Sequence, residues 1–367
     1  MEYGSSFPDK GSWSVTTTLN KSLQLAAEQA VQNQKSALSS QGVGDAIFIG
    51  ENVTNGQLES WAESSINQND TNSLQQLTNV GSLQLPFTYA AYLANTSGSS
   101  TNSTFDDAQM PLPGWPCTNK DFSTGQANCL FDEDHLYLGP LTLYQALAKG
   151  RNVPAVEAAN AIGGDNVSLF TGINKVVATT QEMGSDGACY QAGTTNFTKR
   201  AQTQCYDSAV TGDGFLATHQ HTLQAYATLA NSGNKLPQSA ILRTVINGKT
   251  IYTWSQPKTT SVLSSSIART LSGVLSDANL SWLQSDKGVF TLRNGTKTAI
   301  EYGGSNTFAT GDIQFTSKYA AGFWVEGQKQ ISPAGAAYDG PVLQGSLTGT
   351  TDGLAIPVTY NWLNTAE

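Results

Sequence analysis

Few residue patterns in this sequence could support catalysis on their own. Residues 255–258 (SQPK) have the Ser-x-x-Lys spacing at which, on a helix, a lysine one turn after a serine can take its proton. A proline within the motif, and its place after a hairpin pattern, argue against a helix there. His219 and His221 lie two apart on an expected helix, so they face different directions and make a poor ligand pair.

The four cysteines, Cys117, Cys129, Cys189 and Cys205, fall into two local pairs without a Cys-x-x-Cys motif, so zinc is not expected. Three disulfide connectivities are possible, and we favour the two sequence-local ones, 117–129 and 189–205. Both pairs lie in polar, turn-rich segments that lack a core, where a bridge contributes about 3 kcal/mol. The alternative is four unpaired thiols in a reducing compartment.

An acidic run, Asp132-Glu133-Asp134, precedes His135. It lacks the spacing of a calcium loop, and we interpret it as a solvated loop. We therefore expect neither a metal ion nor another cofactor.

The composition excludes some classes of function. Asp and Glu number 28 against 19 Lys and Arg, a net charge of −9, which argues against nucleic-acid binding because phosphates need a basic face. No stretch approaches the roughly 18 apolar residues of a membrane span. The N-terminus lacks the basic start and apolar run of a signal peptide, so an export address or anchor is expected outside this chain.

Hydrophobic patterning places strands at both ends of the chain and helices in the middle. We expect strands at 45–50, 57–62, 241–246, 249–254, 296–301 and 319–325, and helices at 86–94, 141–149, 154–162, 167–182 and 219–230. Asn247 and Gly248 predict a type I′ turn that joins 241–246 and 249–254 into a hairpin, and Thr218 can cap the helix at 219–230. This order predicts an α+β fold with an inserted helical lobe. The predicted parts are a loose tail (1–12), a domain (13–335) with its sheet from about 41–80 and 240–335 and its lobe at about 82–235, and a C-terminal segment (336–367).

Several stretches, in the expected order, resemble the transpeptidase domain of class A penicillin-binding proteins. They are 81–91 (GSLQLPFTYAA), 139–148 (GPLTLYQALA) running into 152–156 (NVPAV), 225–233 (AYATLANSG), 297–299 (KTA) and 321–327 (AGFWVEG). Residues 15–20 and 23–31 also fit the segment that leads into that domain. The resemblance implies the penicillin-binding-protein/β-lactamase-like fold, an antiparallel sheet flanked by helices. It also implies acyl transfer from a D-Ala–D-Ala stem peptide to an amine, with β-lactams acylating the same serine.

The first family motif places a lysine one helical turn after the nucleophilic serine. Here the nucleophile position is Ser82 and the lysine position is Leu85, whose side chain accepts no proton. General base assistance is worth about 10²- to 10⁴-fold in rate. In the second motif, Ser-x-Asn, Asn152 remains but Gly150 replaces the relay serine, and Arg151 is too basic to act as a base.

The third motif, Lys-Thr-Gly-Thr, is represented by residues 297–300. Lys297 keeps a positive charge, and Thr298 and Ile300 are the expected substrate-binding positions, although Ile300 cannot bind the terminal carboxylate as threonine does. Ala299 adds a methyl group where glycine would allow close approach. Each motif has thus lost a functional group.

Two functions remain open. The first is a module of peptidoglycan synthesis, a pseudoenzyme with weak or no acyl transfer that binds stem peptide or partners. The second is a working serine DD-transpeptidase in which Lys297 substitutes as the base for Ser82. In either case the resemblance implies a bacterial, extracytoplasmic, cell-envelope protein. It also implies a glycosyltransferase domain or membrane anchor outside this chain.

Overall fold

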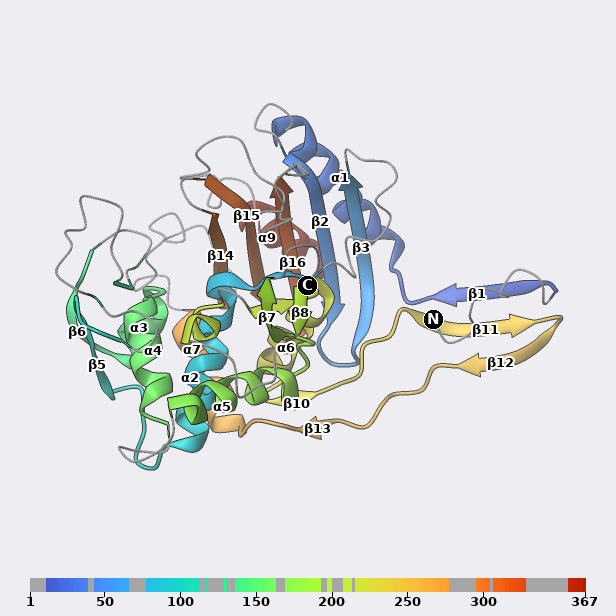
Figure 1. Cartoon of the computed structure of the whole chain (residues 1–367). Coiled ribbons are helices and arrows are strands. Elements are labelled where there is room, and N and C mark those ends of the chain that lie inside the picture. Colours follow the sequence, from blue (N-terminus) through green and yellow to red (C-terminus); the bar gives the residue numbers. More distant parts are fainter. Residues whose placement is uncertain are drawn as a thin grey trace.

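The computed structural model describes residues 11–38, 43–65, 77–112, 117, 129–130, 132, 136–162, 169–192, 197–199, 207–212, 215–276, 295–303, 306–327 and 356–367. Its centre is a five-stranded sheet of order β14-β15-β16-β2-β3, in which every neighbouring pair is antiparallel (Figure 1). The strands are β2 (Val43–Asn52), β3 (Gln57–Ser65), β14 (Gly295–Gly303), β15 (Asn306–Phe315) and β16 (Tyr319–Gly327). Because β16 pairs with β2, strands from the two ends of the sequence meet in one sheet, as the patterning predicts.

Side chains on successive strand residues point to opposite faces, so this sheet separates two cores. Ala46 and Phe48 of β2 join a core built with α1 (Lys21–Leu38) and α9 (Ile356–Ala366). Ile47 and Ile49 join the larger core on the other face. Trp362 of α9 is 1% exposed. The C-terminal segment, which the sequence analysis set apart, therefore packs a helix against the central sheet.

The larger core contains the helical lobe. Its helices are α2 (Leu85–Asn95), α3 (Leu143–Ala148), α4 (Asn152–Asn160), α5 (Leu169–Glu182), α6 (His219–Ala230) and α7 (Ser265–Leu275). Of these, α6 packs directly on β2, β15 and β16. The sequence patterning missed α7, whose N-cap Ser264 accepts a hydrogen bond from the Ile267 amide at 3.3 Å.

Short strands and turns connect these helices. A four-stranded sheet contains β4 (Thr78–Asn79), β9 (Phe215–Ala217), β7 (Ala188–Ala192) and β8 (Phe197–Lys199). Two-stranded pairs are β5 (Thr104–Asp107) with β6 (Gly139–Thr142), and β10 (Asn234–Lys235) with β13 (Thr260–Ser261). The described residues also form the 3-10 turns η4 (Gly81–Gln84) and η7 (Asp207–Val210).

A separate three-stranded sheet extends from the body of the molecule (Figure 1). It contains β1 (Trp13–Thr17), β11 (Ile241–Ile246) and β12 (Lys249–Thr253). The predicted hairpin is present, and Asn247 and Gly248 both adopt positive φ (48° and 79°), as a type I′ turn requires. Through β11, this hairpin pairs with β1 and not with the central sheet. Within the described ranges, no helix has the length and apolarity needed to cross a membrane.

Candidate active site

Ser82 lies in η4, the turn that leads into α2, and its side chain is half-buried. The turn depends on two glycines with positive φ, Gly81 (57°) and Gly212 (89°). The Gly81 amide donates to the Gly212 carbonyl at 3.4 Å, and a Cβ on Gly212 would lie 2.0 Å from the Gly81 carbonyl oxygen. Only glycine at 212 permits this approach, so the backbone sets the position of Ser82.

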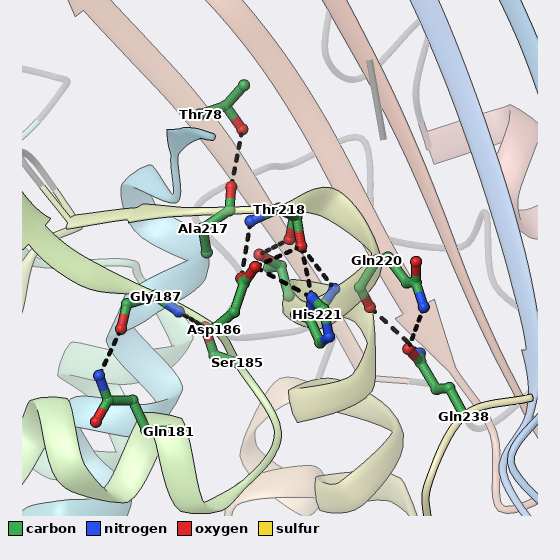
Figure 2. A network of polar contacts seen from close by, with 11 residues as sticks. Thr78, Gln181, Ser185, Asp186, Gly187, Ala217, Thr218, Gln220, His221 and Gln238 are labelled. Atoms are coloured by element: carbon green, nitrogen blue, oxygen red, sulfur yellow. Dashed lines mark hydrogen bonds and ion pairs between the residues drawn. The ribbon is translucent and has the colours of Figure 1, made fainter. Parts of the chain in front are cut away.

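A polar network fixes the strand beside this turn. The Val80 amide donates to the Phe215 carbonyl of β9 at 3.1 Å. Just after β9, Thr218 caps α6, and Asp186 accepts from the Thr218 amide (2.9 Å) and from its hydroxyl (3.0 Å), with His221 Nδ1 at 3.1 Å (Figure 2). Burial would raise the pKa of Asp186, but the bonds from His221 and Thr218 outweigh it and hold that pKa below its usual value.

Leu85, the position at which the resemblance expects a lysine, is fully buried. It belongs to the same core as Leu83, whose carbonyl accepts a 3.0 Å bond from the Tyr226 hydroxyl. The neighbouring Gln84 is also fully buried and donates to Thr180 Oγ1 at 2.8 Å. The side chain at position 85 therefore cannot act as a base for Ser82.

The second-motif segment starts α4. Gly150 has a positive φ of 68°, and Asn152 is the first residue of the helix and half-buried. Arg151 is 2% exposed; its Nε lies 2.8 Å from Asp107 Oδ2, and its Nη2 lies 2.9 Å from Asp132 Oδ2. Interpreting Asp132 as part of a solvated loop was therefore wrong, because its carboxyl group is buried against the guanidinium of Arg151. The signal available in the sequence was a basic residue, Arg151, just before the apolar residues 153–156.

Burial raises the pKa of Asp132 to about 7. The Arg151 guanidinium and the Asn152 amide, which donates to Asp132 Oδ1, lower it, while the Asp107 carboxylate adds to the rise. Burial also raises the pKa of Tyr89 well above its usual value, helped by the same two aspartates. Asp107, Asp132 and Arg151 thus form a buried cluster beside the start of α4.

The third-motif residues Lys297, Thr298, Ala299 and Ile300 lie on β14, at the edge of the central sheet. This strand contacts η4 and so runs beside the turn that carries Ser82. In the register with β15, Thr298 pairs with Asp312. The side chains of residues 297–300 lie outside the described part of the structure.

The cysteine prediction is confirmed for one pair. Cys117 and Cys129 form a disulfide with an S–S distance of 2.04 Å. Cys189 is also disulfide-bonded, and its predicted partner, Cys205, lies outside the described residues. In the ranges that the structure describes, no three His, Cys, Asp or Glu side chains are grouped as a metal site would require.

The helix-covered antiparallel sheet of this chain matches solved structures of penicillin-binding proteins. The structure matches that of penicillin-binding protein PonA1 from Mycobacterium tuberculosis, alone and in complex with penicillin V, each with a TM-score of 0.74 and 17% identity. The match without ligand covers 99% of this chain and 86% of that one; the match to the complex covers 98% and 87%. The apo transpeptidase domain of Burkholderia pseudomallei penicillin-binding protein 3 matches with a TM-score of 0.66 and 14% identity, over 95% of this chain and 94% of that one.

The sequence is 28% identical over 255 residues to penicillin-binding protein 1B of Vibrio cholerae serotype O1, which is 68% of this chain and 29% of that protein. The chain thus spans less than a third of that relative. No protein-family model matches it. The predicted fold class is confirmed, and the chain is similar in sequence to a penicillin-binding protein, as the resemblance led us to expect.

Proposed function

We propose that this chain is a transpeptidase-fold module of peptidoglycan synthesis that binds stem peptide or partner proteins and has weak or no acyl-transfer activity of its own. The observation that carries the proposal is the complete burial of Leu85 in the apolar core, one helical turn after Ser82. A serine hydroxyl without a base is a weak nucleophile. Gly150, which has no hydroxyl to relay a proton, supports the same conclusion.

Acylation by a β-lactam tests the proposal, since a structural relative is known in complex with penicillin V. The native chain is incubated with a fluorescent penicillin beside a repaired Leu85→Lys, Gly150→Ser, Ala299→Gly variant, and intact masses are measured. We expect no stoichiometric adduct on the native chain and an adduct on the repaired one that Ser82→Ala abolishes. Stoichiometric acylation of native Ser82 within minutes would exclude the proposal.

Thermal unfolding of both forms belongs to the experiment, because the repair strains the fold at two positions. Lysine at 85 enters a fully buried site, and serine at 150 must adopt a φ near +68°. The result on the native chain stands even if the repaired form does not fold.

The second candidate is a working serine DD-transpeptidase that crosslinks peptidoglycan through Ser82, with Lys297 as the substitute base. The contact between β14 and η4 favours it, because the strand that carries Lys297 runs beside the serine turn. In that case the native chain is acylated, and both Ser82→Ala and Lys297→Met abolish the adduct. An adduct that survives Lys297→Met would exclude Lys297 as the base.

The longer relative supports a proposal about the rest of the protein. Since the chain corresponds to less than a third of penicillin-binding protein 1B, we propose that a glycosyltransferase domain or a membrane anchor accompanies it in a longer parent. The parent would then place this module on the outer side of the cytoplasmic membrane. Fractionation of cells that produce the parent, followed by protease treatment of spheroplasts, should degrade this module from outside; protection from the protease would contradict it.

A further inference from the structure

The ion cluster at the start of α4 carries unbalanced charge. Asp107 and Asp132 both contact the guanidinium of Arg151, and the three side chains are at most 3% exposed. Because Nε and Nη2 belong to the same planar group, the two carboxyl groups are held side by side. Two ionised carboxylates against one guanidinium would leave a net negative charge buried in the lobe, which is costly.

Among the described residues, the surroundings of the cluster add no compensating positive charge. Asp107 Oδ1 is buried and has no hydrogen-bond partner among the described residues. The titratable groups that face the cluster are Tyr89 from α2, Tyr137 from the segment before β6, and Glu157 from α4, which accepts a 2.6 Å bond from the Asp106 amide of β5. Each of these groups is neutral or acidic.

The cluster also attaches two chain segments to each other. The Leu138 amide donates to Asp107 Oδ2 at 3.1 Å, and the Asn152 amide at the start of α4 donates to Asp132 Oδ1. Arg151 Nη2 donates to the Leu136 carbonyl. Leu136 and Leu138 expose 58% and 42% of their surface, so buried ions rather than apolar packing hold this segment.

We propose that Asp132 retains a proton beside Arg151, shared with Asp107 through a hydrogen bond, and that this proton fastens the segment around Leu138 to the start of α4. With the proton bound the cluster is neutral. Without it, the closed arrangement holds a buried negative charge that opening to solvent relieves. The proposal concerns a conformational device in the lobe and does not depend on the proposed function.

The direction of the pH dependence follows from the proton affinity. In the folded protein the pKa of Asp132 is about 7, whereas an exposed aspartate titrates near 4. The closed arrangement therefore binds the proton more tightly than the open one. The attachment is strongest at acidic pH, weakens by up to about tenfold per pH unit between about 4 and 7, and is constant above about 7.

Hydrogen exchange at the Leu138 and Asn152 amides tests this device in the whole chain. Exchange is followed from pH 5 to pH 8 and corrected for the intrinsic rate. We expect protection to fall by up to about 100-fold between pH 5 and pH 7 and then to level off. Asp132→Asn should make protection independent of pH, because the amide donates a hydrogen where the shared proton lies. Asp107→Asn serves the same purpose if the first variant does not fold.

Two matched control variants should keep the wild-type dependence of protection on pH. Glu51→Gln removes another fully buried carboxyl with a raised pKa, which bonds to Gln238. Asp186→Asn removes a carboxylate that likewise accepts an amide hydrogen at the start of a helix. Protection that does not vary with pH in the native chain, or a slope that persists in both cluster variants, would overturn the proposal. So would loss of the slope in either control, because the proton would then act elsewhere.

Discussion

Replacement of Arg151 by methionine should destabilise the whole domain. The guanidinium is the partner of two buried carboxyl groups, at 2.8 Å and 2.9 Å, and it also holds the Leu136 carbonyl. Removing one member of a buried ion cluster costs about 3–5 kcal/mol, because the remaining charges stay desolvated. Asp132 can relieve part of this cost by holding a proton, since its pKa is about 7. We therefore expect a loss near the lower end, about 3 kcal/mol, at pH 7.

Urea unfolding at pH 7, followed by tryptophan fluorescence and circular dichroism, measures this loss as a lower midpoint at constant slope. Arg243→Met is the matched control, because Arg243 is exposed on β11 and donates to Thr250 Oγ1 at 2.7 Å; it should change stability by less than about 0.5 kcal/mol. Adding Asp132→Asn to Arg151→Met should restore part of the loss by removing one unpaired carboxylate. A loss below about 1 kcal/mol for Arg151→Met would refute the reasoning.

Three further changes have expected outcomes in the same unfolding assay. Trp362→Ala should lower the free energy of unfolding by about 3–5 kcal/mol, since the indole is 1% exposed and donates to the Leu23 carbonyl at 3.1 Å. A loss below about 1.5 kcal/mol would mean that α9 does not stabilise the sheet. Thr218→Ala should cost about 1 kcal/mol through loss of the α6 cap, and no change would contradict the cap. Glu51 has its pKa raised by burial to about 7, against a bond from Gln238 that lowers it, so the folded state holds its proton more tightly. Native stability should fall by up to about 3 kcal/mol from pH 4.5 to pH 7, and Glu51→Gln should lose that component of the slope; equal slopes would contradict this.

Local sequence signals predicted the elements whose stability is local. The helix at 219–230 was predicted from its period and from Thr218, and the structure has it over the same residues. Asn247 and Gly248 predicted the hairpin because few other pairs tolerate positive φ at both turn positions. In both cases the residues that set the geometry lie within a few positions of the element.

Strand β15 was not predicted, because only one of its two buried faces is apolar; Ile313 and Phe315 join the larger core, and the opposite face is polar. Asp312 and Gln314 are fully buried, and Gln314 Nε2 donates to Asp312 Oδ2 at 2.8 Å and to Thr359 Oγ1 of α9 at 2.7 Å. A pattern that expects apolar residues inside a sheet reads such a segment as a loop. The partner that satisfies these groups is 45 residues away in sequence.

In the candidate site, too, local sequence signals were predictive and contacts between distant residues were not. Motif spacing was enough to align Ser82 and Leu85 with the family pattern, but it could not reveal the ion cluster. Asp107, Asp132 and Arg151 come from a strand, a loop and a helix start, and only the tertiary fold brings them into contact. Composition alone therefore led to the interpretation of the acidic run around 132 as solvated. In the structure, Asp132 is buried against Arg151, which is distant in sequence.

The groups that hold the serine turn in place differ from those that the resemblance assigns to chemistry. Gly81 and Gly212 set its backbone path, and the Tyr226 hydroxyl holds the Leu83 carbonyl at 3.0 Å. None of these contacts uses the side chain at position 85. Apolar substitution at that position therefore adds to the core without disturbing the turn, since Leu85 is fully buried among apolar neighbours. The contacts that stabilise the serine turn are therefore separate from the side chain at position 85.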